Sequence, residues 1–249
     1  MNAAIALAKA AQLLPAMLVV EAAANAIPAD VLQISAAAAG LTGQHATSLS
    51  RVSEARVPLH DCEDSRLIVF RDLRDGREHV AVLVGRPDLE RAVPLRVHSA
   101  CLTGDLLGSL RCDCGEQLRS AVRRLAAAGG GILLYLAQEG RGIGLANKLR
   151  AYQLQDAGFD TIDADRQLGF SADERDYGAA VAVLRELGIR QVQLFTNSPH
   201  KTRALQDAGI SVTEVGALHG TPNRHNARYI RTKQDRAGHT RPATEEAPG

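Results

Sequence analysis

The alternation of apolar and polar residues predicts four strands in the first half of the chain. Residues 49–59, 65–73 and 78–84 alternate with the period of two that is typical of half-buried strands. Asp75-Gly76 lies between the last two segments and is a strong hairpin signal, because this pair tolerates the positive φ angles of a tight turn. Together with residues 95–99, these segments predict a mainly antiparallel sheet.

The pattern changes after Cys114, where helical and strand periodicities alternate. The predicted helices cover residues 116–127, 145–157, 173–187, 200–208 and 226–236, and the predicted strands cover 131–136, 191–195 and 210–215. Alternating helices and strands are typical of α/β folds. We therefore predict a mixed α/β fold, with a β-rich antiparallel N-terminal part followed by alternating helices and strands.

Composition divides the chain into three parts. Residues 1–48 are rich in alanine and low in charge and are interpreted as an extension, 49–239 as the main domain, and 240–249 as a disordered tail. The 249 residues are 45% hydrophobic but only 3% aromatic, which predicts an aliphatic core. The formal net charge of +1 gives no electrostatic reason to expect nucleic acid or a membrane as partner, and we expect neither.

The N-terminal extension contains one predicted helix and one predicted strand. Residues 3–14 predict a helix that Pro15 ends, and residues 16–20 predict a short strand. The apolar runs are too short and too interrupted for a membrane span. Lys9 and Pro15 fall inside the apolar stretch and argue against a secretory signal.

Three of the four cysteines lie within fourteen positions, and they indicate a metal site. The one-residue gap between Cys112 and Cys114 suits a disulfide poorly, so we expect reduced thiols in a cytoplasmic protein. With Cys101 they offer three thiolates, which in a zinc site leave one tetrahedral position open for catalysis. The alternative is a structural site with Cys62 or His98 as fourth ligand, and the spacing leaves both open; Cys62 is otherwise expected to be an ordinary free thiol.

Three further segments contain residues that could bind a ligand or act in catalysis, and each also has an ordinary structural explanation. Residues 138–145 (Gln-Glu-Gly-Arg-Gly-Ile-Gly-Leu) follow a buried strand and open a helix, where glycines admit a ligand and free N–H groups attract an anion. Their spacing fits neither a dinucleotide fingerprint nor a P-loop, and they could form only a turn. Lys201 follows another strand, near a helix N-terminus whose dipole it opposes. This small cost points to an anion there, although solvated lysines are far commoner. Asp173 is a natural N-cap and Arg175 a candidate surface arginine.

Taken together and in this order, these segments resemble the GTP cyclohydrolase II family of zinc hydrolases in riboflavin biosynthesis, over about residues 49–239. The matching segments are Arg96-Val-His-Ser99, Cys101-Leu-Thr-Gly-Asp105, Ser109-Leu-Arg-Cys-Asp-Cys-Gly115, Gln138-Glu-Gly-Arg141, Asn147-Lys148, Arg150-Ala-Tyr152, Leu154-Gln-Asp156, Leu168-Gly-Phe170, Asp173-Glu-Arg-Asp176 and Thr196-Asn197.

The resemblance implies a set of site residues. Cys101, Cys112 and Cys114 would hold one zinc ion per subunit, in a site open for catalysis. Asp173 would be the proton acceptor, Arg175 would act at the triphosphate, and Tyr152 would help complete the ring opening. The implied substrate-binding residues are Arg96, Val97, His98, Ser99, Ala100, Gln117, Glu139, Gly140, Arg141, Thr161, Thr196 and Lys201.

The implied reaction opens the imidazole ring of GTP and releases formate and pyrophosphate, leaving a diaminopyrimidine ribosyl phosphate. Mg²⁺ on the substrate phosphates, a homodimer and a cytoplasmic location are implied as well. The sequence departs from the family pattern at five positions, which are Ala100, Ala137, Asp165, Ser198 and Ala217. The alternatives are a zinc hydrolase acting on another nucleotide, which Ala100 and Ala137 would fit, and a non-catalytic nucleotide-binding protein.

Overall fold

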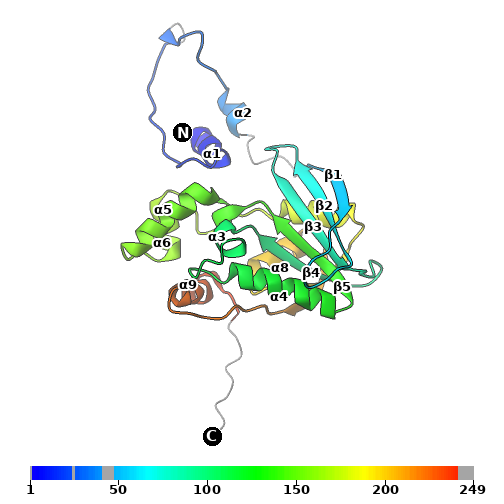
Figure 1. The fold of residues 1–249 in the computed structure, drawn as a ribbon. Coiled ribbons are helices and arrows are strands. Elements are labelled where there is room, and N and C mark those ends of the chain that lie inside the picture. Colours follow the sequence, from blue (N-terminus) through cyan, green and yellow to red (C-terminus); the bar gives the residue numbers. More distant parts are fainter. Residues whose placement is uncertain (1, 24–25, 41–47, 241–249) are drawn as a thin grey trace. The chain divides into compact units, whose positions relative to one another are not determined.

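The computed structural model describes residues 2–23, 26–40 and 48–240, and the chain forms two compact units (Figure 1). Unit 1 combines described residues within Met1–Ala46 with Gly140–Glu174, and unit 2 combines those within Thr47–Glu139 with Arg175–Gly249. Apart from Thr240, the tail expected to be disordered lies outside the described residues. No helix in the described part of the chain is long and apolar enough to cross a membrane.

Unit 2 is built on a seven-stranded sheet of order β1-β2-β3-β5-β4-β6-β7. The strands are β1 Leu49–Arg56, β2 Ser65–Asp72, β3 Glu78–Gly85, β4 Val93–Ser99, β5 Gly130–Leu136, β6 Gln191–Phe195 and β7 Ser211–Gly216. Strands β1, β2, β3 and β5 pair antiparallel, whereas β5, β4, β6 and β7 pair parallel. The prediction of a mixed α/β fold is confirmed.

The hairpin predicted at Asp75-Gly76 joins β2 to β3. The Gly76 N–H donates to the Asp72 carbonyl at 2.8 Å, and Gly76 has φ +74°, the left-handed region that glycine enters without strain. The placement of residues 95–99 with the antiparallel strands is wrong, since β4 pairs parallel with both of its neighbours. A helix connects β4 to β5, and such a crossover returns the chain in the same direction.

The helices of unit 2 are α3 Leu102–Asp105, α4 Cys114–Ala127, α7 Gly178–Glu186, α8 Pro199–Asp207 and α9 Ala227–Ala237. Helix α7 begins at Gly178 rather than at Asp173, so the prediction that Asp173 caps a helix is wrong; the N-cap is Tyr177. The reason is that the preceding turn makes its hydrogen bonds elsewhere, with the Glu174 N–H donating to the Arg141 carbonyl at 3.1 Å.

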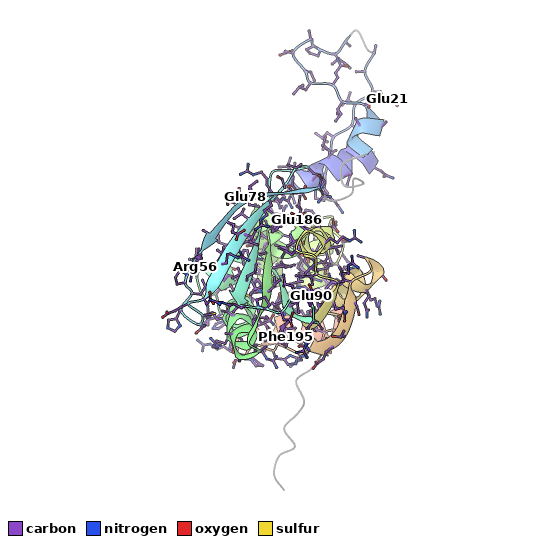
Figure 2. The ribbon with its side chains drawn as sticks, turned by 90° about the vertical axis from the view of Figure 1, so that its right-hand side faces the viewer. Glu21, Arg56, Glu78, Glu90, Glu186 and Phe195 are labelled. Atoms are coloured by element: carbon purple, nitrogen blue, oxygen red, sulfur yellow. The ribbon has the colours of Figure 1, made fainter. Side chains whose placement is uncertain are left out.

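Alternate residues of the strands fill the two faces of the sheet. Ile132, Leu134 and Leu136 of β5 pack with α7 and with Leu205 of α8, whereas Leu133 packs on the other face with Leu125 of α4. This is the period-two division of side chains expected of a sheet that is covered on both sides. Figure 2 draws the side chains of the described residues and labels Arg56 at the end of β1 and Phe195 at the end of β6.

Unit 1 contains the helices α1 Asn2–Ala10, α2 Ala36–Gly40, α5 Gly144–Asp156 and α6 Thr161–Gln167, and the 3₁₀ turn η2 Glu139–Gly142 leads into it. The short strand predicted at residues 16–20 is wrong. Leu18 is 100% exposed, and no strand in the described part of the chain pairs with this segment. Helices α2, α3 and α6 were not predicted, because four to seven residues are too few for a helical period to be recognised.

Candidate functional site

The period of β4 directs two polar side chains to the α4 face of the sheet. Val93, Leu95 and Val97 enter the core beneath α7, so Arg96 and His98, which alternate with them along the strand, point to the opposite face. Both are buried, with exposed fractions of 4% and 2%. A buried arginine and histidine beside the end of a central strand identify this face as the candidate site.

Three thiols converge where β4 and α4 meet. Cys101 precedes α3, Cys114 is the first residue of α4, and the three sulfur atoms lie within 4.8 Å of one another. The Sγ atoms of Cys101 and Cys112 are 3.7 Å apart, and none of the three thiols is in a disulfide. Gly104 makes room for this cluster, because a Cβ at that position would lie 2.7 Å from the Cys112 Sγ.

The cluster fits a tetrahedral zinc ion. Zinc–sulfur bonds of about 2.3 Å in tetrahedral geometry separate the sulfur atoms by about 3.8 Å. The pKa of Cys114 is raised well above the usual value, because hydrogen bonds with the Cys101 and Cys112 thiols and burial all disfavour its thiolate. Three thiolates this close, two of them on buried residues, need a cation to be stable, and a soft divalent metal can supply it.

Neither residue considered as a fourth ligand joins the cluster. His98 Nε2 is hydrogen-bonded to the two carboxylate oxygens of Asp105 at 3.1 and 3.2 Å. Cys62 donates its thiol to the Asp64 carbonyl at 3.4 Å, as an ordinary free thiol can. In the part of the chain that the structure describes, the metal-binding group consists of the three cysteines. This favours the site with an open coordination position.

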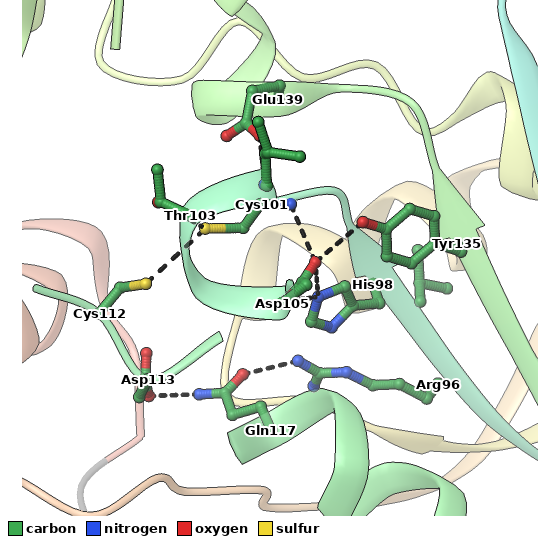
Figure 3. A network of polar contacts seen from close by, with 12 residues as sticks. Arg96, His98, Cys101, Thr103, Asp105, Cys112, Asp113, Gln117, Tyr135 and Glu139 are labelled. Atoms are coloured by element: carbon green, nitrogen blue, oxygen red, sulfur yellow. Dashed lines mark hydrogen bonds and ion pairs between the residues drawn. The ribbon is translucent and has the colours of Figure 1, made fainter. Parts of the chain in front are cut away.

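Asp105 organises the loop that carries the first ligand (Figure 3). Its Oδ2 accepts hydrogen bonds from the Cys101 N–H at 2.9 Å and from the Tyr135 hydroxyl at 3.0 Å, and its carboxylate also holds His98. The His98 and Tyr135 rings stack with centroids 5.6 Å apart, as their pairing between β4 and β5 allows. Sequence reasoning gave Asp105 and Tyr135 no role; the available signal was an acid four residues after a ligand cysteine.

Burial keeps His98 neutral, whereas Arg96 stays charged in spite of its burial. The pKa of His98 is lowered, chiefly because burial disfavours the imidazolium ion. Burial also lowers the pKa of Arg96, to about 10, which leaves it protonated at neutral pH. Arg96 Nε and His98 Nδ1 are buried without a hydrogen-bond partner among the described residues. Such a donor and acceptor are costly unless a ligand or water completes them.

A chain of polar contacts orients the Arg96 guanidinium (Figure 3). Arg96 donates to the Gln117 Oε1 at 2.7 Å and to the Phe195 carbonyl at 3.0 Å. Gln117 donates in turn to the Asp113 carboxylate at 2.5 Å. Burial opposes the charge on Asp113, but Lys233 and the hydrogen bonds outweigh it, so its pKa is lowered. Two predicted binding residues, Arg96 and Gln117, are therefore brought into contact beside the thiol cluster.

Lys201 and Arg175 both lie close to the ring of Tyr177. Lys201 is 6% exposed and donates to the Val97 carbonyl at 2.7 Å, so the interpretation of a solvated lysine is wrong. The Lys201 Nζ and the Arg175 Cζ each lie 5.8 Å from the centroid of the Tyr177 ring, within the range of cation–π attraction. Unit 2 therefore gathers three cationic side chains, counting Arg96, that could receive an anion.

The other predicted residues of unit 2 border the same strand ends. The Glu139 Oε2 accepts from the Leu102 N–H at 2.6 Å, which holds the first turn of α3. Ser99 accepts from the Gln138 amide at 3.0 Å, and the Ala100 N–H donates to the Leu136 carbonyl at 2.8 Å. Thr196 follows β6 and accepts from the Ser198 N–H at 3.0 Å.

Five predicted residues belong to unit 1. Gly140 and Arg141 form the turn η2, and both have φ +62°. A left-handed arginine is uncommon, and such strain occurs mainly at functional turns. Tyr152 lies on α5 with the Lys148 ammonium 5.8 Å from its ring, Thr161 begins α6, and Asp173 lies in the turn before α7.

Asp165, which departs from the family pattern, lies beside Arg141. Its side chain is 5% exposed, and its Oδ2 is 3.9 Å from the Arg141 Nη1. Burial raises the pKa of Asp165 to about 7; Arg141 opposes this rise, and Asp173, Asp160 and Glu174 add to it. The folded chain therefore binds a proton at Asp165 that the unfolded chain releases near pH 4.

We expect Asp165→Asn to stabilise the protein more at pH 8 than at pH 5. The folded-state pKa is raised, so the wild type loses stability as the pH rises from about 4 to about 7, and asparagine does not titrate. The difference in the free energy of unfolding between Asp165→Asn and the wild type should grow by about 2–4 kcal/mol over this window, as measured by urea denaturation. Asp163→Asn, on the same helix but 47% exposed, should change stability by less than about 0.5 kcal/mol. A pH-independent effect of Asp165→Asn would contradict the assignment.

Comparison with known proteins identifies the family. The family model described as GTP cyclohydrolase II matches residues 50–216. The chain is 49% identical to the GTP cyclohydrolase-2 of Azospirillum brasilense over 246 residues, which are 96% of this chain and 64% of that protein. It is 55% identical over 170 residues to the GTP cyclohydrolase-2 of Azotobacter vinelandii, covering 68% of this chain and 82% of that protein. With the riboflavin biosynthesis protein RibBA of Thermotoga maritima it shares 49% identity over 191 residues, 77% of this chain and 48% of that protein.

The match in length differs among these relatives. The chain spans about half to two thirds of several of them, including the Azospirillum and Thermotoga proteins, and about four fifths of the Azotobacter enzyme. The region that the family model matches runs from β1 to β7. The family model covers more than half of the chain, including all three clustered cysteines, and several relatives are about 50% identical to it. The chain therefore belongs to the GTP cyclohydrolase II family.

Proposed function

We propose that the chain hydrolyses GTP at its imidazole ring, releasing formate and pyrophosphate, as the first step of riboflavin biosynthesis. The observation that carries the proposal is the cluster of three thiols at zinc-compatible separation, with no fourth protein ligand among the described residues. The cationic side chains of Arg96 on β4 and Lys201 on α8 suit a nucleoside triphosphate, and family membership agrees with this.

The thiolates of Cys101, Cys112 and Cys114 would hold the zinc ion. Zinc bound by three thiolates supplies Lewis acidity that activates water for attack on the purine carbon. The protein then has to orient the base and the phosphates and move protons. Asp173 would accept a proton, and Arg175 would act at the triphosphate, where a guanidinium can bind phosphate oxygens in bidentate fashion. Tyr152 would assist the completion of ring opening.

The binding residues would divide between the base and the phosphates. Arg96 is held by Gln117 and the Phe195 carbonyl, so its fixed orientation supports a role in positioning rather than loose attraction. The unpartnered Arg96 Nε and His98 Nδ1 support a polar ligand at the end of β4. The remaining proposed contacts are Val97, Ser99, Ala100, Glu139, Gly140, Arg141, Thr161, Thr196 and Lys201.

Further features belong to the same proposal. Mg²⁺ would accompany the substrate phosphates, because it prefers oxygen ligands and commonly bridges them. We also propose a homodimer, and a cytoplasmic location in which the three thiols stay reduced. The domain limits proposed are 1–48, 49–239 and 240–249.

The test is turnover by the zinc-loaded chain with GTP, UTP and other nucleoside triphosphates as separate substrates. We expect formate and pyrophosphate in equal amounts from GTP, with loss of the purine absorbance. Turnover restricted to another nucleotide would overturn GTP as substrate and would point to Ala100 and Ala137, the departures in the binding segments. Zinc binding without turnover of any nucleotide would overturn the enzymatic assignment.

A further inference from the structure

Helix α1 reaches the turn before α7 through an ion pair within unit 1. The Lys9 Nζ donates to the Glu174 Oε1 at 2.6 Å, and the two side chains are 30% and 23% exposed. The Lys9 Nζ also lies 5.7 Å from the centroid of the Phe170 ring. Lys9 lies outside the region that the family model matches, so this contact is made by the N-terminal extension.

Glu174 organises the turn in which Asp173 lies. Its Oε1 accepts from the Ser171 N–H at 2.7 Å, and its own N–H donates to the Arg141 carbonyl at 3.1 Å. The Ser171 hydroxyl donates to the Asp173 carbonyl at 3.2 Å, so the backbone of Asp173 is held from both sides. Burial opposes the charge on Glu174, but the hydrogen bonds from Lys9 and Ser171 outweigh it and lower its pKa, so the carboxylate stays ionised.

The segment that follows the helix of Lys9 is packed against other parts of unit 1. The carbonyl of Gln12 accepts from the Asn147 side chain at 2.9 Å, and a Cβ added at Gly144 would lie 2.9 Å from the Gln12 Cδ. Pro15 packs as closely on Gly169, where an added Cβ would lie 2.8 Å from the Pro15 Cγ. Lys9 therefore approaches Glu174 from a helix whose C-terminal continuation is packed at Gln12 and at Pro15.

We propose that Lys9 is a positioning residue: through Glu174 it fixes the turn of residues 171–174 and with it Asp173. The inference rests on the proposed function, in which Asp173 accepts a proton. It makes the first helix of the extension part of the catalytic apparatus, although Lys9 itself acts only through another side chain. A partly exposed ion pair contributes little to stability, so the effect of losing it should be seen in catalysis rather than in folding.

The experiment compares Lys9→Met, Lys9→Arg and Glu174→Gln in the full zinc-loaded chain. We expect Lys9→Met to lower kcat for GTP about tenfold with KM changed less than about twofold, because a displaced proton acceptor slows the reaction without loosening the substrate. Lys9→Arg keeps the cation and should recover most of kcat. The double variant Lys9→Met/Glu174→Gln should match the more affected single variant, because both changes break one contact.

The matched control is Arg71→Met. It removes an ion pair of similar length, 2.7 Å to Glu78, between β2 and β3 in unit 2, and should leave kcat unchanged. Unchanged kcat in Lys9→Met, or multiplicative losses in the double variant, would overturn the proposal.

Hydrogen exchange separates this inference from the proposed function. Exchange of the Ser171 and Glu174 amides should speed up in Lys9→Met and not in Arg71→Met, whether or not GTP is the substrate. A wild type without GTP turnover would overturn the proposed function, while faster exchange would still support the positioning of the turn by Lys9. Unchanged exchange of these two amides in Lys9→Met would overturn the positioning of the turn by Lys9.

Discussion

Cys112→Ser is expected to abolish stoichiometric zinc binding and the turnover of GTP. Cys112 lies between the other two ligands, 3.7 Å from the Cys101 Sγ, and a serine hydroxyl is a harder and far less acidic ligand than a thiol. Loss of an outer-shell partner already costs 10- to 100-fold in metal affinity, so loss of a direct ligand should cost on the order of 100-fold or more. Zinc content after dialysis and release of formate measure the two effects.

Cys62→Ser is the matched control for this prediction. Its thiol donates to the Asp64 carbonyl and belongs to no metal-binding group among the described residues, and a hydroxyl can make the same hydrogen bond. It should retain one zinc ion per chain and wild-type turnover. If Cys112→Ser also retained the metal, the three-thiolate assignment would be wrong.

Gly104→Ala is expected to disrupt the metal centre without changing any ligand. The added Cβ would lie 2.7 Å from the Cys112 Sγ and 3.1 Å from the Cys101 Sγ, distances that force the thiols apart. Zinc affinity should fall at least about tenfold, since close packing transmits such a displacement to the coordination geometry. Competition with a chromophoric chelator gives the affinity.

Gly108→Ala separates this steric effect from general damage to the loop. A Cβ at Gly108 meets nothing within 4 Å, although its φ of +65° makes alanine strained there. The strain should lower the free energy of unfolding by about 1–2 kcal/mol and leave zinc affinity near the wild-type value. Equal losses of affinity in the two variants would show that the crowding at Gly104 is not the cause.

Local patterns predicted most of the strands and the longer helices. The three strands at residues 49–85 and the helices α4, α5, α8 and α9 lie close to their predicted positions, because their periods extend over several turns or alternations. The predictions that were wrong concern segments whose structure depends on a partner. Residues 16–20 have strand-forming side chains but no neighbouring strand among the described residues. Residues 173–177 form an irregular segment, in which the Glu174 N–H donates to the Arg141 carbonyl rather than within a helix.

The composition of the metal centre could be predicted, but its supporting contacts could not. Thiols 11 and 13 positions apart from Cys101 are recognisable in any sequence, because few other roles suit such a set. Asp105, Tyr135 and Gly104 carry no such signal. Their roles depend on the pairing of β4 with β5, which brings Tyr135 beside His98, and on the path of α3, which places Gly104 against two sulfur atoms.

By itself, the sequence determined which chemical groups this protein has and where its regular elements form. Ligand type, charge and period are properties of nearby residues, and they are independent of how distant segments meet. Only the tertiary structure favours an open coordination position, because it directs His98 to Asp105 and Cys62 to Asp64, away from the three clustered cysteines. It also decided the raised pKa of Asp165 and the contact of Lys9 with Glu174, since burial and proximity arise when segments far apart in sequence pack together.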